Sequence, residues 1–366
     1  MKRLLAIDAA RGIAAILVML YHCNAVVQAP KYFGKSPFGG FFGLDGARMP
    51  IFFALSGFLM VIVHERDLGQ PRRLRRFLIG RITRVYPLYW FMLLILLPAY
   101  AVRPELGGGN ADVDAWTWTR YVFLIPKAGW PEMGFPLLTV AWTLQSMLLF
   151  YLVFALGVWR KLPGLLIFGL WQACVVAGEI LSLNHGFPTR FLLSPLYVGF
   201  LTGGLAAWAF HRDWIRWPKV WFTMGTGILL GFQTLNGFER YPLGYDWQLM
   251  VNCGAAAVAL AGLAQWERGD SLQAPRLLVT WGEASYAIFL FHYPLLSVLA
   301  KAAKAFAIER WLSVEVLFVL FAIVCIFSGL MFHRLVEKPM MRWIRGWVEA
   351  ATSPRKNQEP PSSMAA

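Results

Sequence analysis

The sequence is poor in charged side chains, which make up 15% of its 366 residues, while apolar side chains make up 58%. A soluble domain carries about 25% charged residues and roughly 45–50% apolar ones. Cysteine is scarce too: there are four, all within apolar stretches and none in a Cys-x-x-Cys spacing. The composition therefore excludes disordered, collagen-like and ordinary cytosolic proteins. The cysteines give no sign of a disulfide framework or a zinc site, and we expect no metal.

Long apolar stretches, by contrast, are abundant. A bilayer core needs about 20 apolar residues per helix, and about ten segments of this chain come close to that length. The expected spans are 12–27, 50–63, 85–102, 137–159, 162–183, 191–210, 220–236, 247–265, 277–300 and 312–332. They are continuous, whereas the strands of a membrane barrel alternate in hydropathy over segments of about ten residues. The sequence therefore predicts an all-α, polytopic membrane helix bundle.

We expect this bundle to occupy residues 1–350, because the spans use well over half of the chain and leave no room for a separate soluble domain. Residues 351–366 are rich in Pro and Ser, which predicts a disordered tail. The chain shows no internal repeat, which disfavours a transporter built from inverted repeats.

The distribution of Lys and Arg predicts that both termini face the cytoplasm, since short cytoplasmic loops carry the excess of these residues. The strongest contribution comes from residues 64–84, interpreted as a short inner loop that contains Arg66, Arg72, Arg73, Arg75, Arg76, Arg81 and Arg84. The longest polar interval, 103–139, is then on the outer side. Its tryptophans, among them Trp116, Trp118 and Trp130, either anchor the chain at the membrane interface or form a platform for a sugar ring.

The first predicted helix carries two ionisable residues, and within a membrane span each costs a few kcal/mol and needs a cavity or a partner. Arg11 and His22 are eleven positions apart, so they lie about 20° apart around the helix axis and roughly 16 Å apart along it. This spacing favours a cationic mouth near the cytoplasm joined by a passage to a buried base. The structural alternative is a snorkelling Arg and a hydrogen-bonded core His.

Arg81 and Arg84 are spaced three apart at the start of the third span, so they share a helical face. Two guanidiniums presented together suit phosphate, which they bind by forked hydrogen bonds. Their position at the inner membrane boundary alone gives an equally good explanation. His292 in the ninth span needs a polar partner, which is either catalytic or only structural.

In their order and spacing, several short motifs resemble the acyltransferase 3 family of bacterial membrane O-acyltransferases. They are Arg11 with ten residues before His22, the stretch Phe52–Phe58 containing Ser56, Arg81-x-x-Arg84 followed by Tyr86-Pro87-Leu88-Tyr89, Trp142-Thr143-Leu144, Ser285-Tyr286 followed by His292, and Glu337-Lys338-Pro339.

This resemblance implies about ten helices in the bacterial inner membrane and transfer of an acetyl or other short acyl group from acyl-CoA to a sugar hydroxyl of a surface glycan or its lipid-linked precursor. It implies functional roles for Arg11, His22, Arg81 and Arg84. We then expect acetyl-CoA to enter from the cytoplasm with its phosphates on the three arginines, and His22 to act as a base or as a transient acyl carrier. Supporting roles are expected for Ser56, Trp142, Tyr286, His292 and Glu337.

One departure from the family stands in the fourth span, where Met147 occupies a position at which relatives often carry Glu. Glu179 and Glu283 are the candidates to replace that carboxylate. Two other functions remain open from the sequence. One is a transporter or flippase of glycan or lipid precursors, and the other is a sensory or assembly protein that has lost its activity.

Overall fold

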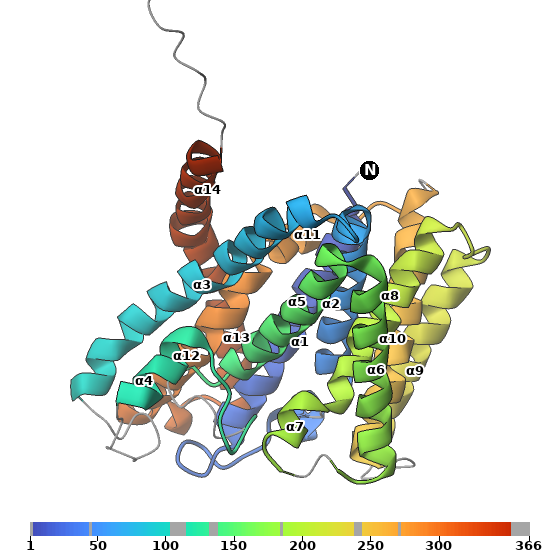
Figure 1. Cartoon of the computed structure of the whole chain (residues 1–366). Coiled ribbons are helices and arrows are strands. Elements are labelled where there is room, and N and C mark those ends of the chain that lie inside the picture. The colour runs from blue at the N-terminus through green and yellow to red at the C-terminus, as the bar shows by residue number, and fades with distance from the viewer. Residues whose placement is uncertain are drawn as a thin grey trace, which may run out of the picture.

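The computed structural model describes residues 3–43, 46–102, 115–131, 138–183, 186–237, 244–269 and 272–352. Of the expected disordered tail, residues 351 and 352 belong to a helix, and the rest lies outside the described residues. Throughout these residues the secondary structure is helical, and no strand occurs in them (Figure 1). The predicted all-α helix bundle is therefore confirmed.

Nine helical segments of the described chain are long and apolar enough to cross a membrane. They are built on α1 (Leu5–Gln28), α2 (Arg48–His64), α3 (Pro71–Val102), α5 (Ala141–Trp159), α6 (Lys161–Ile180), α8 (Val198–His211), α10 (Tyr245–Arg268), α12 (Ser285–Ala305) and α13 (Val314–Phe332). With these segments, the chain is a multi-pass membrane protein.

The expected span at 220–236 is also a helix, α9 (Pro218–Gly237), but its polar residues leave it less apolar than the nine. It packs along α10 through small residues. A Cβ on Gly225 would collide with the backbone of Ala255 and Ala259, so the two helices approach as closely as their backbones allow. The helix is thus held in the bundle by packing rather than by apolar surface alone.

The arginine-rich segment at 64–84 is not a loop, contrary to the sequence interpretation. After a short 3₁₀ turn at Glu65–Asp67, α3 begins at Pro71 and includes every arginine from Arg72 onwards. Proline suits the first position of a helix, and Arg and Leu, which follow it, are good helix formers. The positive charge therefore lies on a rigid element that runs into the membrane span.

The expected span at 277–300 is interrupted at Ala284, which separates α11 (Arg276–Glu283) from α12. Just before this break, α11 lies directly against α1. A Cβ on Gly282 would collide with the carbonyl of Asp8, so glycine lets the two backbones touch. The close approach places the Gly282 carbonyl beside α1, where the candidate site uses it.

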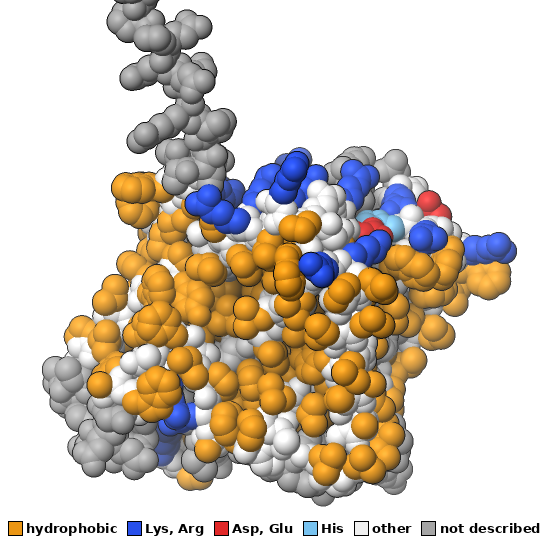
Figure 2. Space-filling model, in the orientation of Figure 1, with side chains coloured by type: hydrophobic (Ala, Val, Ile, Leu, Met, Phe, Trp, Pro, Cys, Tyr) orange, Lys and Arg blue, Asp and Glu red, His pale blue; other side chains and the backbone are white. Residues whose placement is uncertain are grey.

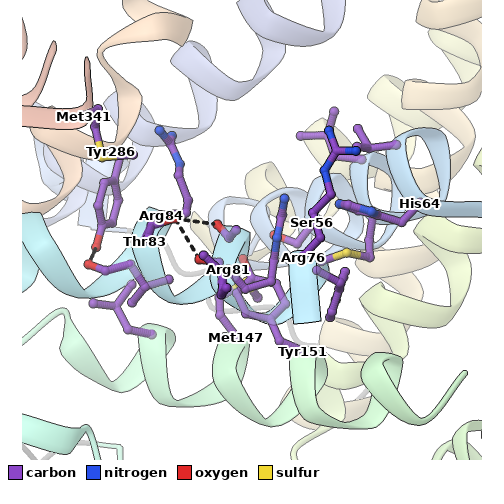
Figure 3. A pocket seen from close by; sticks show the side chains of 18 of the residues that line it. Ser56, His64, Arg76, Arg81, Thr83, Arg84, Met147, Tyr151, Tyr286 and Met341 are labelled. Atoms are coloured by element: carbon purple, nitrogen blue, oxygen red, sulfur yellow. Dashed lines mark hydrogen bonds between the residues drawn. The ribbon is translucent and has the colours of Figure 1, made fainter. Parts of the chain in front are cut away.

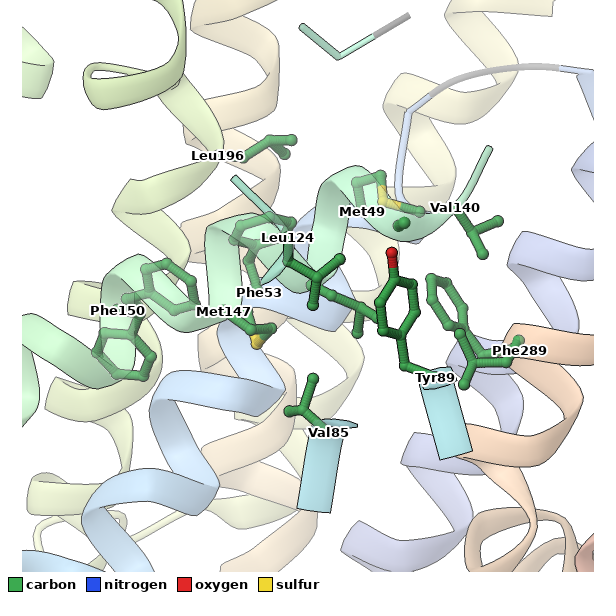
Figure 4. Packing of buried hydrophobic residues seen from close by; sticks show 14 of the residues in the cluster. Met49, Phe53, Val85, Tyr89, Leu124, Val140, Met147, Phe150, Leu196 and Phe289 are labelled. Atoms are coloured by element: carbon green, nitrogen blue, oxygen red, sulfur yellow. The ribbon is translucent and has the colours of Figure 1, made fainter. Parts of the chain in front are cut away.

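The largest hydrophobic cluster fills the space between α2, α3, α5 and α8 (Figure 4). The rings of Phe150 and Phe200 stack with their centroids 4.0 Å apart, and Phe53 lies 5.0 Å from Phe200. Glycines bring α2 and α8 together, since a Cβ on Gly203 would meet the carbonyl of Ala54. Dense packing of this kind holds the helices that carry the candidate site in fixed positions.

After α13, a one-turn π-helix (His333–Glu337) leads into α14 (Lys338–Thr352), which rises out of the bundle (Figure 1). The start of α1 and α14 lie at the same end of the molecule. On the face shown in Figure 2, Lys and Arg side chains gather at this end, above a broad hydrophobic band. We call it the basic end.

Candidate functional site

A pocket of about 1190 Å³ lies at the basic end, between α1, α2, α3, α5, α12 and α14 (Figure 3). Its lining contains eight arginines, which are Arg11, Arg72, Arg73, Arg75, Arg76, Arg81, Arg84 and Arg345. The one acidic residue in the lining, Asp67, is paired with His64 at 2.7 Å and with Arg73 at 2.5 Å. The lining therefore has a large excess of positive charge, which suits a ligand with several phosphate groups.

The structure brings five of the predicted residues together in this lining: Arg11, Ser56, Arg81, Arg84 and Tyr286. Arg81 and Arg84 lie one turn apart on α3, as their spacing predicts (Figure 3). The guanidinium of Arg81 lies 5.7 Å from the ring centroid of Tyr151 and forms no ion pair within the described residues. Its charge is thus available to a ligand.

Arg84 is held from behind by a buried carboxylate. Nη1 of Arg84 lies 3.4 Å from Oε1 of Glu337, and Oε2 of Glu337 lies 2.7 Å from Nδ1 of His333. Glu337 is 2% exposed. The π-helix that spans His333–Glu337 is a rare conformation that often occurs at functional sites. It sets Glu337 against Arg84, although Glu337 is not itself part of the pocket lining.

Tyr286 fixes the same region from α12. Its hydroxyl donates a hydrogen bond of 2.7 Å to the carbonyl of Val85, and the Arg84 guanidinium lies 5.3 Å from its ring centroid. Ser56 on α2 donates its hydroxyl proton to the carbonyl of Phe52 at 2.8 Å. Tyr286 thus joins α12 to α3 at the pocket, whereas the hydrogen bond of Ser56 stays within α2.

Arg11 lies at the same pocket on α1, and its side chain is anchored by α11 and by its own helix. Nε and Nη2 donate to the carbonyl of Gly282 at 3.0 and 2.8 Å, and Nη2 lies 3.1 Å from Oδ1 of Asp8. Nη1 makes no hydrogen bond within the described residues. The guanidinium is therefore fixed in place while one of its nitrogens stays available.

The inner end of the pocket is apolar. It is lined by Ala15, Phe52, Leu144, Met147 and Phe289. Met147, at the position where the resemblance leads us to expect Glu, is part of this lining and 4% exposed. Glu179 and Glu283 do not line the pocket, and Glu283 pairs with Arg3 at 2.9 Å. Neither carboxylate takes the place of the missing one.

The catalytic candidate His22 does not line this pocket. It meets His292 instead: Nδ1 of His22 lies 3.0 Å from Nε2 of His292, and the rings stack with centroids 5.2 Å apart. Arg11 and His22 therefore do not face one common passage in this conformation. The rings of Phe52 and Phe289 line the pocket instead, and the ring of Phe289 lies 6.1 Å from that of His292, which helical spacing along α1 does not reveal.

The hydrogen bonds of the histidine pair assign a tautomer to each ring. Nδ1 of His292 lies 3.0 Å from the carbonyl of Ile288, which accepts only, so this nitrogen carries the proton. In a neutral ring Nε2 of His292 is then an acceptor, and Nδ1 of His22 must be the donor to it. Nε2 of a neutral His22 is left with its lone pair. Such a nitrogen can accept a proton from a substrate hydroxyl.

Trp142 lies away from both sites. Its ring packs 6.5 Å from that of Phe53 and 5.6 Å from that of Trp130, centroid to centroid. Trp130 is buried, whereas Trp116 is half exposed. The tryptophans expected on the outer side are therefore divided between core packing and surface, and Trp142 supports the site only through the hydrophobic core.

Sequence reasoning missed the residues that anchor Arg11 and the aromatic end of the pocket. Asp8 carries a signal, because it is a second ionisable residue three positions before Arg11. The carbonyl of Gly282 carries none, since a backbone atom does not show in a motif. Phe52 belongs to one of the motifs, but the sequence does not show that its ring stacks on Phe289 of α12.

Comparisons with known proteins show what the chain as a whole is similar to. A model of the acyltransferase domain matches residues 4–333. The exopolysaccharide production protein ExoZ of Rhizobium meliloti is 26% identical over 316 residues, which cover 83% of this chain and 92% of that protein. The peptidoglycan O-acetyltransferase OatA of Listeria monocytogenes is 27% identical over 320 residues, or 80% of this chain and 49% of that protein. The chain thus spans about half the length of OatA. No solved structure matches significantly.

Proposed function

The chain belongs to the acyltransferase 3 family, and from that premise we propose that it transfers an acetyl or other short acyl group from acyl-CoA to a sugar hydroxyl of a cell-surface glycan or its lipid-linked precursor. That it is an acyltransferase follows from the family. What we propose is the identity of the acyl donor and of the acceptor. Membership of an enzyme family also favours this function over a transporter or a sensory protein.

The observation that supports acyl-CoA as the donor is the pocket, which is lined by eight arginines and by a single acidic residue that is already paired. Coenzyme A carries phosphate groups at one end and its thioester at the other end of a flexible arm. Guanidiniums bind phosphate oxygens with paired, charge-assisted hydrogen bonds. Arg11, Arg81 and Arg84 would hold the phosphates, and the apolar inner end would receive the arm.

The basic end would face the cytoplasm, where acyl-CoA is made. Lys and Arg are enriched on the cytoplasmic side of membrane proteins, and they gather at this end (Figure 2). The protein would then lie in the bacterial inner membrane with its N-terminus and α14 inside. The acceptor hydroxyl would reach His22 from the opposite side of the membrane.

In the transfer step, Nε2 of His22 takes the proton of the acceptor hydroxyl as its oxygen attacks the thioester carbonyl. The carbon–sulfur bond breaks, and the leaving thiolate takes the proton from the imidazolium. The products are an O-acyl sugar and free coenzyme A. General-base assistance of this kind contributes about 10²–10⁴-fold to the rate. His292 keeps His22 in the required tautomer through the 3.0 Å contact.

A comparison of surface glycans tests the acceptor. Cells with and without the gene are analysed by NMR for O-acyl groups on extracted polysaccharide and on peptidoglycan. The proposal predicts loss of O-acyl signals from one of these glycans in the deletion strain and their return with the wild-type gene. Identical acylation of both glycans in the two strains would refute a surface-glycan acceptor.

A test of the donor uses the purified protein. We expect it to bind acetyl-CoA and to release free coenzyme A when the acceptor glycan is present. Absence of acetyl-CoA binding would reject the donor, while the family assignment would stand.

A further inference from the structure

The inner end of the arginine-lined pocket is closed by two stacked aromatic rings. Phe52 on α2 and Phe289 on α12 both line the pocket, and their ring centroids are 5.7 Å apart with an angle of 14° between the planes. Phe289 is 3% exposed, and Phe52 is half-buried. We call these two residues the aromatic pair.

The histidines lie on the far side of the aromatic pair. The ring centroid of Phe289 is 6.1 Å from that of His292, which is one turn further along α12. Neither His292 nor His22 lines the pocket. Phe289 lines the pocket and its ring also lies near that of His292, so the two stacked rings form a layer on the pocket side of His292.

This layer is supported from behind. The ring of Phe52 lies 5.9 Å from that of Phe53, which is fully buried in the hydrophobic core and packs on Phe200. A close-packed core resists displacement of a ring, because the neighbouring side chains leave no space for it. The position of the layer is therefore defined by the fold.

We propose that the aromatic pair sets the length of the acyl group that the pocket accepts; this inference rests on acyl-CoA being the donor. With the phosphates on the arginines, the arm of the donor points inward and its acyl group lies against the two rings. A two-carbon group is short enough to end against the rings, with its carbonyl on the pocket side of Phe289, and rotation of that ring in place would open the way to the histidine pair. A longer chain has to displace a packed ring.

Equilibrium binding to the purified protein in detergent tests this inference, with coenzyme A, acetyl-CoA and hexanoyl-CoA as the three ligands. In the wild type we expect hexanoyl-CoA to bind about tenfold or more weakly than acetyl-CoA, as poorly fitting methylenes are discriminated in a closed apolar pocket. Phe289→Ala should bring the two affinities within a few-fold of each other, because it removes the wall. Phe52→Leu should act in the same direction and disturbs the fold less, since Phe52 is only half-buried.

Phe291→Ala is the matched control. Phe291 is on the same helix, but its ring stacks on Phe332 at 4.9 Å and does not line the pocket, so the ratio of affinities should stay at the wild-type value. A gain in hexanoyl-CoA binding cannot come from misfolding. Equal wild-type binding of both thioesters, or an unchanged ratio in Phe52→Leu, would overturn the length limit. Failure of the wild type to bind coenzyme A at all would instead overturn the donor.

Discussion

His22 and His292, 270 positions apart in the chain, are joined by a contact of 3.0 Å between Nδ1 of the first ring and Nε2 of the second. The contact continues from Nδ1 of His292 to the carbonyl of Ile288, again at 3.0 Å. These two hydrogen bonds connect the backbone of α12, through His292, to the side chain of His22 on α1. It leaves Nε2 of a neutral His22 unprotonated, which is the state that a general base needs.

The first prediction concerns His292 as a positioning residue. His292→Leu removes the acceptor for Nδ1–H of His22, so kcat should fall by about 10-fold or more while KM for acetyl-CoA stays unchanged. His292→Gln should recover part of the loss, because its amide oxygen can accept the same hydrogen bond. A purely structural role would give equal losses in both variants. His211→Gln, at a half-buried histidine that pairs with Glu65 outside the pocket, is the control and should keep wild-type kcat.

The second prediction concerns the phosphate-binding arginines. Arg81→Ala removes a guanidinium with no carboxylate partner in the described chain, so it leaves no buried charge behind. Loss of a charge-assisted hydrogen bond costs about 1.5–3 kcal/mol, and KM for acetyl-CoA should therefore rise by about tenfold or more. Arg216→Ala, at an exposed arginine outside the pocket, is the control. Steady-state kinetics at fixed salt measure both; equal KM values would argue against the phosphate site.

The third prediction concerns Glu337, which holds Arg84 in position. Glu337→Gln weakens that contact, so KM for acetyl-CoA should rise by less than in Arg84→Ala. Because both changes act on the same guanidinium, the double variant should resemble Arg84→Ala alone. Additive effects in this double-mutant cycle would show that Glu337 acts independently of Arg84.

The fourth prediction concerns the close contact between α2 and α8. A Cβ on Gly203 would collide with the carbonyl of Ala54, so Gly203→Ala should lower the unfolding temperature by several degrees, a cost of about 1–3 kcal/mol. Gly254 on α10 has open space at the same position, and Gly254→Ala is the matched control. Thermal unfolding in detergent compares the two. An equal unfolding temperature for both variants would mean that the helices can separate without loss.

Much of the fold could be predicted from the sequence because an apolar stretch is a local property. The spans at α5 and α6 agree with the predicted ranges within a few residues. The start of α3 at Pro71 could not be predicted, since a dense run of arginine is equally typical of a loop at the membrane surface. The break at Ala284 could not be predicted either, since the predicted span at 277–300 continues across it in the sequence.

The candidate site was predicted in parts but not in its arrangement. The shared face of Arg81 and Arg84 follows from helical geometry, and the structure has both in one pocket. The same geometry places Arg11 and His22 on one face, yet it says nothing about what a neighbouring helix contributes. Helix α12 contributes Phe289, which lines the pocket and lies near His292, and it also carries His292, the partner of His22. The separation of Arg11 from His22 and the pairing of His22 with His292 both depend on contacts between distant segments of the chain.

The most direct test of the account is to measure acetyl-CoA binding and acetyl transfer on the same preparations of wild type and His22→Ala. Since His22 lies outside the arginine-lined pocket, the variant should bind acetyl-CoA with wild-type affinity. Its transfer rate should fall by about 10²–10⁴-fold, because the base is gone. Wild-type transfer by His22→Ala would contradict the assignment of His22 as the base.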